Sequence, residues 1–383
     1  MSSLPIPGPD AQKNSQQLCE LIQHDIALQE GWIPFSRFME LALYAPGLGY
    51  YSAGASKFGA AGDFVTAPEL SPLFGRTLAY QIAEIITLST PHILELGAGS
   101  GKLALDILTE LERMQHLPDT YSILEISADL RERQQTLLQT HLPHLAHRIK
   151  WLDELPDTLS GAIIANELLD ALPVHLVRWT NTDIFERGVS VKGNNFIWVD
   201  RLAETPALLE QAQRISVPEN YLSEISLNAA GLVSGLSERL SSGAILFFDY
   251  GFGSREYYHP QRNYGTLMCH YRHHAHDDPF FLPGLQDITA HVDFTAIAEN
   301  AIDHGAHLLG YTSQAHFLMN AGIMDLISAV SPDNLRDYLP LSAQIQKLTS
   351  PAEMGELFKV IALGKGIKSP LRNFVVGDKS RLL

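Results

Sequence analysis

The stretch ILELGAGSGKLALDIL (residues 93–108) contains an apolar run, three closely spaced glycines and a second run with helical periodicity. The first run predicts a buried strand, and the second predicts a helix. Free backbone N–H groups at the start of such a helix favour an anionic group of a ligand, either a phosphate or a carboxylate. We therefore expect a ligand-binding turn here. The residues predicted to bind the ligand are Glu95, Gly97, Ala98, Gly99 and Gly101.

The spacing of these glycines distinguishes between classes of ligand. A dinucleotide-binding turn has the pattern G-x-G-x-x-G, but Lys102 stands where the third glycine belongs. The chain also lacks the G-x-x-x-x-G-K-[ST] pattern of nucleoside triphosphate sites. An NAD-dependent dehydrogenase is therefore disfavoured. Any tight turn between a strand and a helix needs glycines, so a purely structural explanation of this turn stays open.

An acidic residue ends the next apolar run, YSILEIS, at Glu125. In doubly wound α/β proteins an acidic side chain at this position accepts hydrogen bonds from a ribose. The two strand ends together predict a ligand with a ribose and a carboxylate but no pyrophosphate, and S-adenosyl-L-methionine fits that description. We assign Glu125 and its neighbour Ile126 to the binding of this cofactor.

Three polar residues, Asn166, Glu167 and Asp170, follow the apolar run that ends in AIIAN. Ligands of open α/β sheets bind outside the carboxyl ends of the strands, so these side chains are expected near the reaction. Methyl transfer is an in-line displacement, and an arginine acceptor must also lose a proton. We predict that Asn166 binds the cofactor, and that Glu167 and Asp170 are catalytic and face the acceptor. The alternative for Asp170 is a turn before Pro173.

Residues at the ends of two further predicted strands are candidates for the site, and each also has a purely structural explanation. Asp153 follows the run RIKWL and is predicted to meet the adenine of the cofactor, or else to be a solvated turn residue. Tyr250 closes the run AILFFDY and either walls the acceptor pocket or belongs to the core. Methyl transfer to nitrogen needs no metal, and no metal ligands are assigned.

The composition excludes several classes of function. The 383 residues include 43 acidic and 27 basic ones, a formal net charge of −16 that argues against binding nucleic acid. The two cysteines favour a reducing compartment over a disulfide scaffold. The first residues resemble neither a secretory signal nor a mitochondrial transit peptide, and no apolar run is long enough to span a membrane. We therefore expect a cytoplasmic protein without a membrane span.

Strand-like and helix-like stretches alternate along most of the chain, which predicts an α/β fold with a doubly wound, mostly parallel sheet and helices on both faces. The alternation breaks where three stretches between 174 and 200 look like antiparallel strands. We interpret this region as an insertion that forms a second lobe together with N-terminal helices. The predicted domains are a disordered lead-in at 1–16, an N-terminal helical and loop segment of the substrate lobe at 17–90, a Rossmann-like core at 91–173 and 242–366, and the inserted part of the lobe at 174–241.

Several uncommon strings occur together in this sequence and in one known family. The chain resembles the MidA-like class I S-adenosylmethionine-dependent methyltransferases, which include a mitochondrial complex I assembly factor that methylates an arginine of a complex I subunit. The resemblance runs from about Leu18 to Gly364, and the chain departs from the family at Ala98, where proline is common. The strings are PGLGYY (46–51), GDFVTAPELSPLFG (62–75), LELGAGSGKLALDIL (94–108), ANELLDALPV (165–174), FDYGF (248–252), GTLMCHYRHH (265–274), DITAHVDF (287–294) and MGELFKV (354–360).

The resemblance implies a seven-strand methyltransferase sheet that holds S-adenosyl-L-methionine, and a substrate lobe beside it. It also implies that Thr66, with Asp63 and Glu69, lies near the cofactor entrance. The implied activity is arginine methylation of a protein, with a subunit of a respiratory complex among the candidate partners. Two alternatives stay open at this point: a small-molecule O- or N-methyltransferase, and a cofactor-bound assembly factor whose catalysis is incidental.

Overall fold

The computed structural model describes residues 4–52, 66–328, 330–331 and 333–383. The chain divides into two compact units, each built from three separate segments. Unit 1 comprises Met1–Phe64, Asp170–Gly231 and Ser254–His291, and unit 2 comprises Val65–Leu169, Leu232–Gly253 and Val292–Leu383. Asp63 lies outside the described residues.

Unit 2 contains an eight-stranded sheet among its described residues, in the order β15-β16-β10-β5-β2-β3-β4, with β14 paired to β10. The strands from β10 to β4 run parallel, and β16 runs antiparallel to both of its neighbours. The expected doubly wound, mostly parallel sheet is confirmed. The strands are β2 (His92–Leu96), β3 (Thr120–Leu124), β4 (Ile149–Leu152), β5 (Leu159–Asn166), β10 (Leu240–Phe252), β14 (Val292–Asp293), β15 (His307–Ser313) and β16 (Phe358–Lys365).

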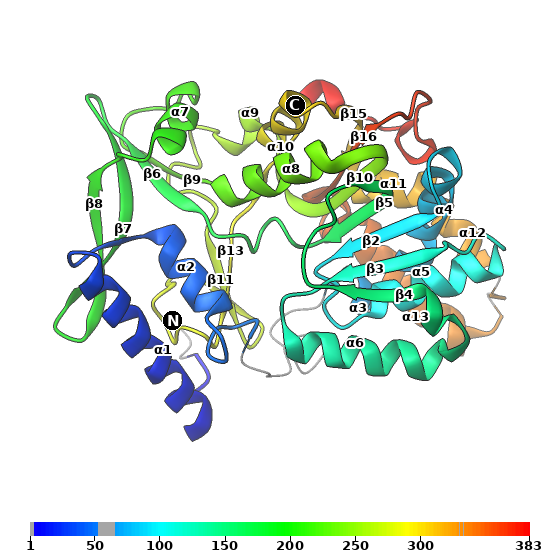
Figure 1. Cartoon of the computed structure of the whole chain (residues 1–383), viewed down its shortest axis with the longest axis horizontal. Helices are drawn as coiled ribbons and strands as arrows, with labels where there is room; N and C mark the ends of the chain where they lie inside the picture. The colour runs from blue at the N-terminus through cyan, green and yellow to red at the C-terminus, as the bar shows by residue number, and fades with distance from the viewer. Residues whose placement is uncertain (1–3, 53–65, 329, 332) are drawn as a thin grey trace. The chain divides into compact units, whose positions relative to one another are not determined.

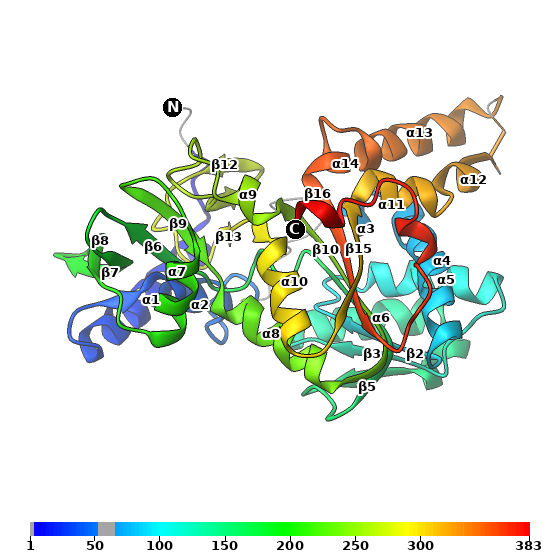
Figure 2. The same ribbon diagram turned by 90° about the horizontal axis from the view of Figure 1, so that it is seen from above.

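Helices lie on both faces of this sheet. Figure 2 shows α10 on one side of the strands, and α4 with α5 on the other. Asp293 accepts hydrogen bonds from the first backbone N–H groups of α10, which begins at Phe294. The helices of unit 2 are α3 (Ala67–Leu70), α4 (Pro72–Leu88), α5 (Lys102–Arg113), α6 (Ala128–His141), α10 (Phe294–Asp303), α11 (Gln314–Asn320), α12 (Ile323–Ser328), α13 (Leu335–Thr349) and α14 (Met354–Leu357), while α8 (Leu227–Arg239) crosses the unit boundary.

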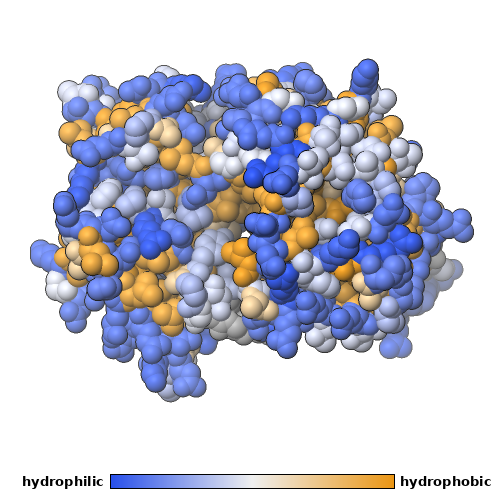
Figure 3. All heavy atoms as spheres, in the orientation of Figure 1, coloured by the Kyte–Doolittle hydropathy of each residue, from blue (hydrophilic) through white to orange (hydrophobic). Residues whose placement is uncertain are grey.

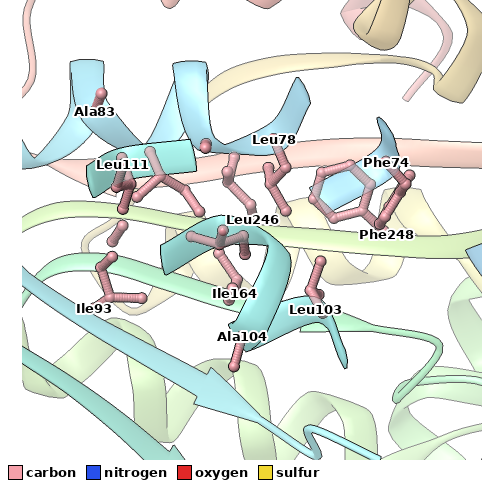
Figure 4. Packing of buried hydrophobic residues seen from close by; sticks show 14 of the residues in the cluster. Phe74, Leu78, Ala83, Ile93, Leu103, Ala104, Leu111, Ile164, Leu246 and Phe248 are labelled. Atoms are coloured by element: carbon pink, nitrogen blue, oxygen red, sulfur yellow. The ribbon is translucent and has the colours of Figure 1, made fainter. Parts of the chain in front are cut away.

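The core of unit 2 forms where α4 and α5 pack on the sheet. Apolar side chains of both helices point at those of β5 and β10, as Figure 4 shows for Leu78, Leu103, Ile164 and Leu246. Phe74 lies edge-on to Phe248, with ring centroids 5.5 Å apart. Burial of this apolar surface holds the carboxyl ends of the strands in a fixed register.

The described residues of unit 1 form two smaller sheets. In the first, β1, β7, β6 and β9 lie side by side, β8 pairs with β7, and all the pairings are antiparallel. The second has the order β12-β11-β13. The elements of unit 1 are α1 (Pro9–Leu28), β1 (Ile33–Pro34), α2 (Phe35–Tyr44), β6 (His175–Trp179), β7 (Ile184–Lys192), β8 (Asn195–Leu202), α7 (Pro206–Arg214), β9 (Tyr221–Ile225), α9 (Ser254–Tyr257), β11 (Met268–Tyr271), β12 (His274–His276) and β13 (Asp287–Thr289). Figure 1 marks most of these elements by label.

The structure differs from the expected lead-in at 1–16, because α1 already begins at Pro9. A proline at the first helical position is tolerated, since its missing N–H would have no partner in the helix. The side-chain amide of Gln12 also donates to the carbonyl of Pro7 at 3.2 Å, which holds the start of the helix. The prolines therefore do not prevent a helix from Pro9 onwards.

The compact units also differ from the expected domain boundaries, and two of the differences involve whole elements. Helix α4 belongs to unit 2, although it was expected in the substrate lobe, because its apolar face is part of the core described above. Residues 254–291 belong to unit 1, although they were expected in the Rossmann-like core. Cys269 and Ile288 of that segment are buried in the same cluster as Leu18 of α1.

No helix of the described part of the chain is long and apolar enough to cross a membrane. Hydrophilic residues cover much of the face seen in Figure 3, with apolar residues in smaller groups between them.

We expect Phe74→Ala to lower the free energy of unfolding by roughly 3–5 kcal/mol, because it leaves a cavity against Phe248. Chemical denaturation followed by circular dichroism measures this change. The matched control is Leu88→Ala, at the exposed end of the same helix, which should cost less than about 1 kcal/mol. Equal losses in the two variants would contradict this description of the core.

Candidate functional site

The glycine turn connects β2 to α5 and has a left-handed backbone at each of its three glycines. The φ angles are +65° at Gly97, +53° at Gly99 and +84° at Gly101. A Cβ atom at Gly97 would lie 3.0 Å from Leu168, and one at Gly101 would lie 3.2 Å from the Cα of Gln134. The dihedral angles therefore favour glycine at all three positions, and the close approach of neighbours favours it further at Gly97 and Gly101.

Glu95 lies in the strand that leads into this turn and is only 2% exposed. The hydroxyl of Tyr121 donates to its carboxylate at 2.8 Å. Burial raises the pKa of Glu95 to about 7, against the lowering effect of the Tyr121 hydrogen bond. This carboxyl group lies within the sheet at the base of the turn, and its assignment to the cofactor stays a prediction.

Glu125 lies directly after β3, which is the neighbour of β2 in the sheet. Its buried carboxylate accepts hydrogen bonds from the backbone N–H of Ser127 at 2.9 Å and from the side chain of Gln134 at 3.0 Å. Burial raises the pKa of Glu125, and these donors act in the opposite direction. Beside it, the side chain of Ile126 is 76% exposed and offers an apolar surface at the strand end.

Glu167, directly after β5, has a φ angle of +50°, which is unusual for a residue with a side chain. Its backbone N–H donates to the carbonyl of Phe248 at 2.8 Å, and the side-chain amide of Asn166 donates to its carboxylate at 3.1 Å. Strained backbone of this kind persists where the surroundings fix it, and it gathers at functional sites. Among the described residues, the buried Oδ1 of Asn166 has no hydrogen-bond donor.

The segment that follows Glu167 is held by Asp249 at the end of β10. The buried carboxylate of Asp249 accepts from the backbone N–H groups of Leu169 and Tyr250, each at 2.9 Å. The ring of Tyr250 lies edge-on to Phe358, with centroids 5.4 Å apart. Asp249 therefore fixes the backbone on which Glu167 is placed.

Asp170 belongs to unit 1, because the unit boundary falls between Leu169 and Asp170. Asp170 is buried, and its backbone carbonyl accepts from the N–H of Ala290 at 3.0 Å. The hydroxyl of Tyr44 donates to the carbonyl of Ala171 at 2.9 Å. The catalytic assignments of Glu167 and Asp170 stay predictions.

Thr66 precedes α3, whose single turn is attached to the glycine turn by two contacts. The hydroxyl of Ser100 donates to the carboxylate of Glu69, and the ammonium of Lys102 donates to the carbonyl of Glu69 at 3.2 Å. Thr66 itself is buried and makes no capping hydrogen bond through its side chain. The side chains of Ser100 and Lys102 thus have a positioning role that the glycine pattern did not indicate.

The structure places Asp153 in an exposed position, with its side chain 87% accessible. Its carboxylate forms an ion pair with Arg131 at 2.6 Å. The contact with adenine stays a prediction, and the solvated alternative agrees with this exposure.

Sequence reasoning missed Gln134 and Tyr121. Gln134 stands at the position of an apolar residue in α6, four residues after Leu130 and four before Leu138. Tyr121 occupies an inward position of β3, two residues before the buried Ile123. In both cases a polar group at a core position of a periodic pattern was the available signal.

The comparisons with known proteins agree with this geometry. Residues 77–312 match a family model described as S-adenosyl-L-methionine-dependent methyltransferase, which covers more than half of the chain. The chain belongs to this family. It is an S-adenosyl-L-methionine-dependent methyltransferase, and S-adenosyl-L-methionine is its cofactor.

Curated relatives and solved structures support the same family. The chain is 30% identical to the mitochondrial protein arginine methyltransferase NDUFAF7 of Danio rerio, over 87% of this chain and 83% of that protein. It is 29% identical to the homologue of Drosophila melanogaster, over 89% and 83%. A crystal structure from Burkholderia thailandensis with bound S-adenosyl-homocysteine is 49% identical over the whole of both chains, with a TM-score of 0.96.

The names of these relatives contradict the expected cytoplasmic location, because they place those proteins in mitochondria. The cytoplasmic assignment is therefore wrong. The pattern of the first residues is no guide to the location of the protein.

The residues at the strand ends fit the cofactor. The buried oxygen of Asn166 that has no donor can accept from the ammonium of the cofactor's methionine part. Helix α5 begins directly after the turn, and the N–H groups at the start of a helix favour the cofactor's carboxylate. The exposed Ile126 can pack on the adenine, and the carboxylate of Glu125 can accept from the ribose.

We expect Gly101→Ala to weaken the binding of S-adenosyl-homocysteine by at least about tenfold, because the added Cβ meets Gln134 and strains the turn. Isothermal titration calorimetry measures the dissociation constant. The matched control is Gly193→Ala, where φ is also left-handed but the added Cβ meets nothing. Unchanged affinity in Gly101→Ala would contradict the assignment of this turn.

We also expect Glu95→Gln to change how the stability of the protein depends on pH. A carboxyl whose pKa is raised from 4.5 to about 7 binds its proton more tightly in the folded state. Its contribution to stability is therefore greatest at low pH and is lost as the pH rises from about 4.5 to about 7. The loss is at most about 3 kcal/mol.

Urea denaturation at a series of pH values measures this effect. The fall in unfolding free energy over that window should be smaller in Glu95→Gln than in the wild type. The exposed Glu132→Gln is the control and should follow the wild type. Parallel curves for the wild type and Glu95→Gln would show that folding does not raise the pKa of the Glu95 carboxyl.

Proposed function

We propose that the protein transfers the methyl group of S-adenosyl-L-methionine to an arginine side chain of another protein. The observation that carries this proposal is the position of Glu167, whose carboxylate stands at a strand end on strained backbone beside Asn166. The curated relatives, which are named protein arginine methyltransferases, support it.

When bound, S-adenosyl-L-methionine supplies an electrophilic methyl group on a sulfonium. In our proposal the glycine turn binds its carboxylate, Asn166 its ammonium, Glu125 its ribose, and Ile126 packs on its adenine. The hydrogen bonds made by the Glu167 backbone N–H and by the Asp249 carboxylate fix the backbone at this end of the sheet before the cofactor binds.

The role proposed for Glu167 follows from the chemistry of arginine. A guanidinium with a pKa above about 12 is a poor nucleophile until its charge is polarised by an acceptor. A carboxylate can accept two of its N–H groups and orient the third nitrogen towards the methyl group. Methylation of the third nitrogen requires the guanidinium to give up one proton. Glu167 would accept it from an N–H group that it binds and pass it to water. Asp170 is proposed as a further catalytic carboxylate.

We propose unit 1 as the lobe that binds the acceptor protein. The net charge of −16 complements a basic segment that contains the target arginine. A subunit of a respiratory complex is the proposed class of partner, in line with the family resemblance.

We expect Glu167→Gln to lower the rate of methyl transfer by about 100-fold or more, because the isosteric amide cannot accept the proton. The affinity for S-adenosyl-homocysteine should change by less than about threefold, since the substitution keeps the side-chain shape. The exposed Glu154→Gln is the matched control and should keep full activity.

The assay uses radiolabelled methyl donor and protein extract from cells that lack this enzyme. Hydrolysis of the labelled protein and chromatography of its amino acids should find the label in methylarginine. Label in another amino acid or in the small-molecule fraction would overturn the proposal, and in the second case would favour a small-molecule methyltransferase.

A further inference from the structure

A buried glutamine stands on the apolar face of α6. Gln134 is 0% exposed and shares this face with Leu130 and Leu138. Burial of an amide is costly unless its donors and acceptors are satisfied, so a glutamine in place of a leucine here needs a reason.

The side-chain amide of Gln134 joins three parts of the site. Its Nε2 donates to the carbonyl of Gly99 at 2.9 Å and to the carboxylate of Glu125 at 3.0 Å. Its Oε1 accepts from the indole N–H of Trp151, in β4, at 3.0 Å. Because the indole can only donate, the oxygen must face Trp151 and the NH₂ must face the two acceptors.

The backbone of α6 also touches the glycine turn directly. The Cα of Gln134 lies 3.2 Å from the position that a Cβ of Gly101 would occupy. The C=O and N–H groups of a trans peptide point in opposite directions. Because Gln134 donates to the Gly99 carbonyl, the Ser100 N–H points away from Gln134. One residue therefore contacts both the turn and the Glu125 carboxylate.

We infer that Gln134 is a positioning residue for the cofactor, which locks the glycine turn and the Glu125 carboxylate together as one preformed binding surface. This inference rests on the proposed contact between Glu125 and the ribose. Without Gln134, the Glu125 carboxylate keeps its hydrogen bond from the Ser127 N–H but loses the bridge to the Gly99 carbonyl. The cost of ordering this bridge on binding would be subtracted from the binding energy. Trp151 supports the arrangement because it fixes which way the amide faces.

The test measures the dissociation constant of S-adenosyl-homocysteine by isothermal titration calorimetry. Gln134→Met keeps the size of the side chain and removes its hydrogen bonds, so the dissociation constant should rise by roughly 10- to 100-fold. Gln134→Glu places a second carboxyl group against Glu125 and should weaken binding further, by about 100-fold or more. The matched control is Gln139→Glu on the exposed face of the same helix, which should bind as the wild type does.

A reciprocal exchange separates positioning from a general loss of structure. In the double variant Glu125→Gln with Gln134→Glu, an amide again donates to a carboxylate between the two positions. We expect it to bind at least about tenfold more tightly than Gln134→Glu alone. A mere defect in folding would instead be worsened by the second substitution, and thermal denaturation of each variant reports that defect separately.

Three results would overturn the inference: Gln134→Met with wild-type affinity, a double variant no better than Gln134→Glu, or Glu125→Gln with wild-type affinity. None of these measurements needs a methyl acceptor. If the arginine proposal fails, the binding measurements still test the role of Gln134. If the role of Gln134 is disproved, the methylation assay still tests the arginine proposal.

Discussion

The close packing of the glycine turn on helix α6 is the constraint on which the site depends. The turn can adopt its conformation because three glycines accept left-handed dihedral angles, and α6 can approach it because Gly101 has no side chain. That approach brings the Gln134 amide within hydrogen-bonding distance of both Gly99 and Glu125. The geometry of two strand ends is thus fixed by the packing of one helix.

The part of the site at the end of β5 is fixed by a different interaction, in which one buried carboxylate accepts hydrogen bonds from backbone N–H groups. Asp249 accepts from two backbone N–H groups, and the segment before Leu169 is thereby held in place. The left-handed conformation of Glu167 is a local cost that these contacts offset. Preorganisation of this kind suits methyl transfer, in which the enzyme chiefly positions the donor and the acceptor.

The elements around the candidate cofactor site could be predicted from the sequence because they are local. The strand, the turn and the helix around Gly99 are adjacent in the chain, and Glu125 follows at the end of the next strand. Gln134 and Asp249 could not be assigned roles, because each acts through contacts with residues 9 to 80 positions away. The exposure of Asp153 depends in the same way on its pairing with Arg131, which no local pattern indicates.

The division of the chain into two units was hard to predict, because sequence order does not follow the packing. Residues 254–291 follow a core strand, yet they join unit 1 through their buried apolar side chains. The most direct test of the account is a calorimetric titration of the purified wild-type protein with S-adenosyl-homocysteine and, separately, with NAD. The account predicts one molecule of S-adenosyl-homocysteine bound per chain, with a dissociation constant in the range of about 1–100 μM, and no binding of NAD. Binding of NAD, or no binding of S-adenosyl-homocysteine, would contradict it.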